Sequence, residues 1–137
     1  MISYSYNYPF SLIREDQYSE WIKSVIEVEG FELGDLSYAF LGDEELLKLN
    51  QEYLDHDTLT DIISFDYTVG KVIQGEVFIS VERVKENAEK FGVDFNSELS
   101  RVMIHGVLHY CGYKDKTEQE KMVMRQKEDF YIALLNR

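Results

Sequence analysis

Cysteine, proline, basic residues and long hydrophobic runs are all scarce in this chain of 137 residues. The single cysteine, Cys111, excludes an internal disulfide and fits a reducing compartment. No uncharged apolar run approaches the roughly 20 residues of a membrane span. The first residues have neither the basic nor the apolar region of a signal peptide. We therefore expect a cytoplasmic protein that makes no use of a membrane.

Basic side chains are outnumbered by acidic ones. Fourteen Lys and Arg residues stand against 26 Asp and Glu residues, which leaves a net charge of −12. Proteins that hold nucleic acid owe much of their affinity to Lys and Arg contacts with phosphates, so this balance disfavours a general RNA- or DNA-binding surface. An acid excess also serves solubility and by itself indicates no ligand.

The chain does have enough apolar material for a core, with 45% hydrophobic and 14% aromatic residues. This content excludes a disordered chain. The length suits one domain. Because no repeat, low-complexity tract or Pro/Gly/Ser-rich linker interrupts the sequence, we expect a single domain over 1–137.

Hydrophobic periodicity predicts the secondary structure. Apolar and polar alternation, with β-branched and aromatic residues, predicts strands over 2–8, 36–41, 62–67 and 76–80. Helical spacing predicts helices over 14–29, 43–53, 80–91, 97–110 and 117–135. This order predicts an α+β fold, a small four-stranded mixed sheet packed with about five helices.

Capping residues place several helix ends. Asp43, Ser80 and Asn96 are expected N-caps because their side chains accept hydrogen bonds from exposed amides of the first turn. Thr117 and Glu120 have the spacing of a capping box and open the last helix.

Two of the three histidines, His105 and His109, lie four residues apart on the helix expected over 97–110. Side chains at i and i+4 share one face, with Cβ atoms about 5–6 Å apart, so two imidazoles can reach one metal ion. A turn at Gly112 would bring Asp115 back toward the pair. Two imidazoles and a carboxylate form a catalytic zinc donor set that leaves a position for water, whose pKa then falls to about 7.

Other interpretations of this pattern remain open. An H-x-x-x-H pair on a helix is often two partly buried histidines with ordinary hydrogen-bond partners. His56, in a polar loop, is the fallback third ligand. Metalloproteases of the H-E-x-x-H type carry their general base where Gly106 stands here, so the sequence disfavours peptide hydrolysis by that mechanism.

The segment HGVLHYCGYKDK (105–116) resembles H-G-x-L-H-L-x-G-Y-D-H, the signature of the YbeY family of bacterial rRNA maturation factors, metal-dependent endoribonucleases. Upstream, LNQEYLDHDTLTDIISFDY (49–67) resembles the family's L-N-x-x-Y-R-x-x-D-x-x-T-D-V-L-S-F-P, and GEVFIS (75–80) resembles its G-D-I-x-I-S. The blocks keep the family's order, and with the expected elements the resemblance spans about 36–120.

The resemblance implies a zinc-dependent hydrolase with one Zn²⁺ per chain. Its implied activity is cleavage of single-stranded RNA during small-subunit rRNA maturation and ribosome quality control. The implied partners are ribosomal RNA or a ribosomal particle, with ribosomal or assembly proteins.

The resemblance also implies roles for particular residues. His105 and His109 fall on the first two zinc ligands, and Asp115 stands where the family has its third histidine. Aspartate also coordinates zinc, at about 2.0–2.2 Å. Asp61 is a candidate for orienting a ligand histidine or acting as a base, with a loop-to-strand cap as the alternative. Candidate substrate-binding residues are Thr60, Ser64 and Arg101.

Leu54 is the main departure from the family, because it stands where the family has an arginine. Leucine cannot grip a phosphate as a guanidinium does. Arg101, Lys114 and Lys116 are nearby cations that could replace it. Two other functions therefore stay open, a metal-dependent hydrolase of another substrate and a non-enzymatic ribosome assembly factor with structural zinc. An open coordination position favours an enzyme, and a closed four-ligand shell favours the assembly factor.

Overall fold

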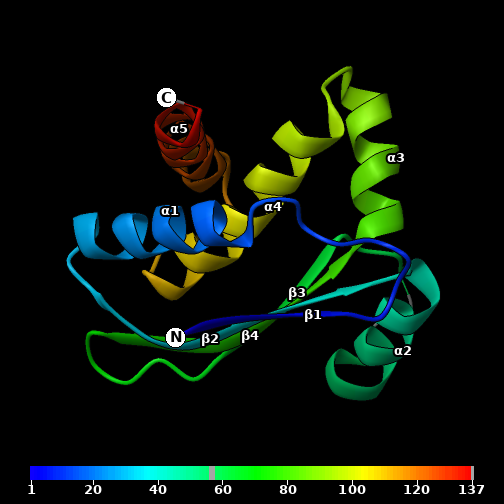
Figure 1. Cartoon of the computed structure of the whole chain (residues 1–137), viewed down its shortest axis with the longest axis horizontal. Coiled ribbons are helices and arrows are strands. Elements are labelled where there is room, and N and C mark those ends of the chain that lie inside the picture. The colour runs from blue at the N-terminus through cyan, green and yellow to red at the C-terminus, as the bar shows by residue number, and fades with distance from the viewer. Residues whose placement is uncertain (56–57, 137) are drawn as a thin grey trace.

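A computed structural model describes residues 1–55 and 58–136 of the chain (Figure 1). Its elements in chain order are β1 (Ile2–Tyr6), α1 (Glu15–Val28), β2 (Glu32–Leu41), α2 (Asp43–Leu54), β3 (Ile62–Asp66), β4 (Val72–Ser80), α3 (Val81–Phe91), α4 (Phe95–Tyr110) and α5 (Glu118–Leu135). Within the described residues, no helix has the length and apolar character needed to cross a membrane.

The four strands form one mixed sheet in the order β1-β2-β4-β3. β1 and β4 both pair with β2 in parallel, while β3 and β4 form an antiparallel pair. The short connection between β3 and β4 explains their antiparallel pairing, since parallel neighbours need a longer crossover. The expected α+β class, with its mixed four-stranded sheet and five helices, is confirmed.

The helices form unequal layers on the two faces of the sheet. α1 and α4 pack on one face with α5 outside them, and α2 covers part of the other face (Figure 1). Alternate β2 residues, Leu36, Tyr38 and Phe40, are almost fully buried under α1 and α4. The opposite face carries a smaller cluster in which Leu46 of α2 packs on Ile63. The larger core therefore lies beneath α4, the helix that carries the histidine pair.

Two of the expected caps are wrong. The N-cap of α2 is Gly42, because the Asp43 carboxylate bonds Arg83 and the Ser80 hydroxyl instead of a first-turn amide. α4 begins two residues earlier than expected, and its cap is Asp94, whose carboxylate accepts from the Ser97 amide at 2.8 Å.

The other two capping expectations are confirmed. The Ser80 hydroxyl accepts from the amide of Arg83, as expected for the start of α3. Both hydrogen bonds of the capping box between Thr117 and Glu120 are present at the start of α5.

Candidate metal centre

α4 holds its histidine pair close to the sheet because of the glycine between them. A Cβ added at Gly106 would lie 3.2 Å from Cδ1 of Ile62 on β3. The absent side chain therefore lets β3 approach the helix, so the space over Gly106 is taken by Ile62. His105 and His109 lie on the same side of α4, where their rings meet edge to face with centroids 4.6 Å apart.

The chain turns back on itself directly after α4. Gly112 has a φ of 102°, a left-handed conformation that favours glycine. The Gly112 amide donates to the His109 carbonyl at 3.0 Å and the Tyr113 amide to the Leu108 carbonyl at 3.1 Å. This pair of bonds is a Schellman motif, which satisfies the last carbonyls of a helix. The turn predicted at Gly112 thus exists and delivers Asp115 to the histidine face.

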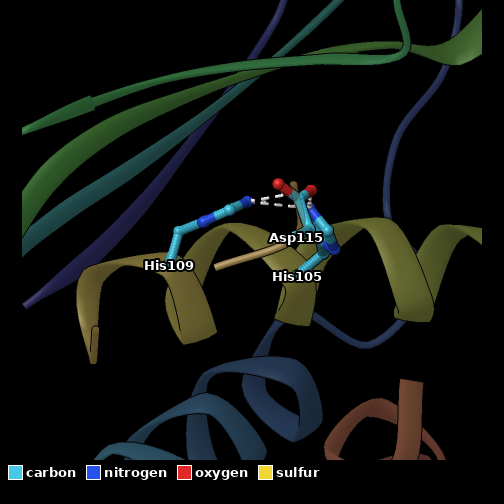
Figure 2. A group of neighbouring side chains, drawn as sticks. All are labelled: His105, His109 and Asp115. Carbon is cyan, nitrogen blue, oxygen red and sulfur yellow. Dashed lines mark hydrogen bonds and ion pairs between the residues drawn. The ribbon is translucent and has the colours of Figure 1, made fainter. Parts of the chain in front are cut away.

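Three possible ligand atoms converge on one point. Nε2 of His105 lies 3.0 Å from Nε2 of His109, and Oδ2 of Asp115 lies 3.0 Å and 3.3 Å from these two nitrogens. Figure 2 shows both imidazoles directed toward the Asp115 carboxylate above α4. The three side chains are 23%, 32% and 39% exposed, so the cluster is reachable from solvent.

The partners on the far side of each ring determine where the histidine protons lie. Nδ1 of His105 is 2.7 Å from Oε2 of Glu128, and Nδ1 of His109 is 2.9 Å from the carbonyl oxygen of Tyr113. Carboxylate and carbonyl oxygens accept hydrogen bonds, so each Nδ1 carries a proton. In the neutral rings both Nε2 atoms then hold lone pairs that face each other and an acceptor carboxylate. A cation between them satisfies all three, so this donor set fits a metal ion.

The charges around His105 favour a positive species at this point. Burial lowers the pKa of His105, but the hydrogen bond and charge of Glu128, with the charges of Asp115 and Asp61, raise it overall above the ordinary 6.5. A proton on Nε2 is therefore the natural competitor of a metal ion, because metal binding requires neutral histidine.

Glu128 is a partner of the candidate site that reasoning from the sequence missed. Its side chain is 6% exposed, and Oε1 accepts from Nη1 of Arg101 at 2.8 Å while Oε2 accepts from His105. The residue lies on the inner face of α5 with Met124 and Tyr131, both buried. The sequence did contain a signal, because Glu128 is a carboxylate at an apolar position of an amphipathic helix. Buried charges are almost always paired, so such a residue indicates a partner in the core.

Asp61 lies directly before β3. Burial raises the pKa of its carboxyl above the ordinary value, while backbone amides of Asp61 and Ile62 and the charge of His105 act to lower it. The amide bonds are those of the loop-to-strand cap weighed above. The carboxylate that orients His105 at Nδ1 is that of Glu128 and not that of Asp61. The other expected role of Asp61, as a base, stays a prediction.

Thr60, Ser64 and Arg101, the candidate substrate-binding residues, all have partners inside the protein. The Thr60 hydroxyl donates to the Ile62 carbonyl at 3.5 Å, and Ser64 hydrogen-bonds the Tyr110 hydroxyl. Arg101 pairs with Glu128 and also with Asp129, at 2.6 Å.

Lys114 and Lys116 are exposed on either side of Asp115, whereas Arg101 is paired. Leu54 is the last residue of α2 and is 42% exposed. His56, the fallback ligand, lies outside the described residues. Among the described residues, the group of three ligand atoms within 4.8 Å of one another is completed by Asp115.

The fold and the three converging donors define a small α+β protein with a candidate hydrolytic metal centre. A family model described as Endoribonuclease YbeY matches residues 6–136. The chain belongs to this family. The resemblance predicted from the motifs is confirmed, and so is the expectation of an enzyme of the hydrolase class.

Individual relatives agree over nearly the whole length. Endoribonuclease YbeY of Flavobacterium johnsoniae is 53% identical over 136 residues, which cover 99% of this chain and 98% of that protein. The protein of the same name from Flavobacterium psychrophilum is 52% identical, with 99% and 97% covered. The solution structure of TM1509 from Thermotoga maritima matches with a TM-score of 0.74 and 26% identity, covering 98% of this chain and 89% of that one.

Proposed function

We propose that this protein is a zinc-dependent endoribonuclease that cuts single-stranded RNA in small-subunit rRNA maturation and ribosome quality control. Membership of the endoribonuclease YbeY family supports the reaction class. Metal dependence is inferred from one observation. When both rings are neutral, Nε2 of His105, Nε2 of His109 and Oδ2 of Asp115 are three acceptors that converge with no hydrogen donor among them. Zinc prefers nitrogen and carboxylate donors of this kind, and three protein ligands leave a position open.

The residues that would hold the ion are His105, His109 and Asp115. A bound zinc ion supplies a Lewis acid for a phosphoryl oxygen and an acidified water. The protein's own contribution is orientation, because Glu128 and the Tyr113 carbonyl hold the Nδ1 protons and thereby direct both Nε2 atoms to the same point. Asp61, whose pKa is raised by burial and whose charge interacts with that of His105, is the proposed proton acceptor.

Substrate contacts in this proposal come from the lysines that flank the third ligand. Lys114 and Lys116 are exposed beside Asp115, whereas Arg101 is already paired with two carboxylates. Two lysines give little affinity for free RNA in a protein of net charge −12. We therefore assign most of the affinity to a ribosomal particle or an assembly protein that presents the RNA.

A second candidate is a metal-dependent hydrolase of another, smaller substrate. Two observations favour it: Leu54 replaces the arginine expected from the family motif, and the guanidinium of Arg101 is held by Glu128 and Asp129. Neither residue offers a phosphate a free bidentate partner.

Cleavage of single-stranded RNA by metal-stripped and zinc-reloaded protein tests the proposal. We expect cleavage only after reloading, loss of cleavage in His109→Ala, and retention in His56→Ala, which removes the third histidine of the chain. Cleavage that survives both metal removal and His109→Ala would contradict the proposed site. Hydrolysis of bis(p-nitrophenyl) phosphate without RNA cleavage would move the second candidate ahead.

A further inference from the structure

A largely buried carboxylate from another part of the chain reaches the loop that carries the third ligand. Glu29, at the C-terminal end of α1, has a side chain that is 9% exposed. Its Oε1 accepts from the Tyr113 hydroxyl at 2.7 Å, and its Oε2 accepts from Lys127 at 3.2 Å and from the Tyr131 hydroxyl. Three donors compensate the burial of this charge, as a desolvated carboxylate requires.

Tyr113 links this carboxylate to the metal centre, because it is bonded at both ends. Its hydroxyl donates to Glu29, while its carbonyl accepts from Nδ1 of His109 at 2.9 Å. Its ring also lies under the ammonium of Lys127, 5.5 Å from the centroid. Asp115 follows two residues later. Tyr113 therefore joins Glu29 both to the acceptor of the His109 proton and to the segment that leads to Asp115.

We propose that Glu29 is a remote positioning residue of the metal centre, acting through Tyr113. This inference rests on the proposed function, because it concerns how the same three ligands are held. The hydrogen bonds of the Glu29 carboxylate run to Tyr113, Lys127 and Tyr131 and not to the ligand side chains, and they hold the loop between α4 and α5 against the end of α1. A 1 Å displacement of such a loop is enough to weaken a metal site whose ligands must meet within a few tenths of an ångström.

The carboxylate also anchors Tyr131, which lies in the core, and this provides a matched control. Tyr113→Phe and Tyr131→Phe each remove one hydroxyl that donates to Glu29 and leave the ring in place. Of these two tyrosines, Tyr113 is the one that also hydrogen-bonds a candidate metal ligand, through its carbonyl and Nδ1 of His109. If Glu29 has a purely structural role, both variants should lose similar stability and should not differ in metal affinity.

Competition between the protein and a chelator for Zn²⁺ at fixed pH measures the difference. We expect Tyr113→Phe to weaken zinc binding about tenfold, the lower end of the range for residues that support metal ligands. Tyr131→Phe should bind zinc as the wild type does, while its metal-free form loses stability like Tyr113→Phe. Glu29→Gln should weaken zinc binding at least as much as Tyr113→Phe, since glutamine offers one acceptor oxygen to three donors.

A second readout needs no metal. Long-range ¹H–¹⁵N NMR of the neutral His109 ring should show the proton on Nδ1 in wild type and Tyr131→Phe, and a mixture of tautomers in Tyr113→Phe. An unchanged tautomer and unchanged zinc affinity in Tyr113→Phe, or equal losses of affinity in the two phenylalanine variants, would overturn the positioning role. Absence of zinc binding by the wild type would instead overturn the proposed function itself.

Discussion

Replacing Glu128 with glutamine tests the buried carboxylate that the structure places behind the first histidine. Oε2 of Glu128 is 2.7 Å from Nδ1 of His105, and Oε1 is 2.8 Å from Nη1 of Arg101. Both neighbours are donors, so both oxygens must accept. Glutamine keeps the volume but has one acceptor oxygen, so its amide NH₂ group must face either the imidazole or the guanidinium.

The expected losses follow from this mismatch. The side chain is 6% exposed, so water does not restore the missing acceptor. Losing a hydrogen bond to a charged group costs about 1.5–3 kcal/mol in the free energy of unfolding of the metal-free protein. A ligand histidine that loses its orienting partner weakens metal affinity by about 10–100-fold, or about 1.4–2.8 kcal/mol.

Asp129→Asn is the matched control, because Asp129 pairs with the same guanidinium but is 60% exposed. An exposed ion pair contributes only about 0–1 kcal/mol, so this variant should unfold nearly as the wild type does and bind zinc equally well. Urea unfolding of the metal-free proteins and chelator competition for zinc give the two quantities. If Glu128→Gln and Asp129→Asn behave alike in zinc affinity, Glu128 does not orient His105.

Three further predictions concern other parts of the molecule. Leu54→Arg should tighten binding of single-stranded RNA about tenfold and steepen the slope of log affinity against log salt concentration by about 0.7. Binding titrations at several salt concentrations measure both quantities. No gain in affinity would mean that this end of α2 does not face phosphates. Asp115→Ala should lose zinc and Asp115→His should retain it by elemental analysis, whereas normal zinc in Asp115→Ala would exclude this carboxylate as a ligand. Burial would raise the pKa of Glu29, but its three hydrogen-bond donors lower this pKa below the ordinary 4.5. The ionised carboxylate therefore stabilises the fold above that pH, and its contribution disappears as the pH falls through the folded pKa. Urea unfolding against pH should therefore show Glu29→Gln less stable than wild type at neutral pH, with a difference that shrinks in acid; a constant difference would contradict this.

Much of the fold was predictable because its periodic patterns are local. The strand at Ile62–Asp66 agrees with the pattern to within one residue, and the helix that carries the histidines ends at Tyr110 as expected. β2 begins earlier than expected, at Glu32, because Glu32 and Leu33 pair with Val72 and Ile73 of β4, although Gly34 and Asp35 interrupt the apolar pattern of the strand. Tertiary pairing of this kind overrides local preference, and no sequence window contains it.

The candidate site also has a part that local sequence patterns predict and a part that depends on tertiary packing. His105 and His109 are adjacent on a helix, so their spacing predicts a shared face. Asp115 needed only the turn at Gly112, which the glycine permits. Glu128 of α5 contacts His105 directly, whereas Glu29 at the end of α1 is connected to His109 through Tyr113, and both are distant in the sequence from these histidines. Their roles depend on how α1, α4 and α5 pack, which the pattern of one helix does not encode.

Anomalous diffraction at the zinc edge from crystals of the zinc-loaded protein tests the central claim most directly. We expect one peak per chain, about 2.0–2.2 Å from Nε2 of His105, Nε2 of His109 and a carboxylate oxygen of Asp115, with a water molecule in the remaining position. A peak elsewhere, or no peak, would contradict the proposed centre. A fourth protein ligand closing the shell would contradict the catalytic role and favour a structural zinc in an assembly factor.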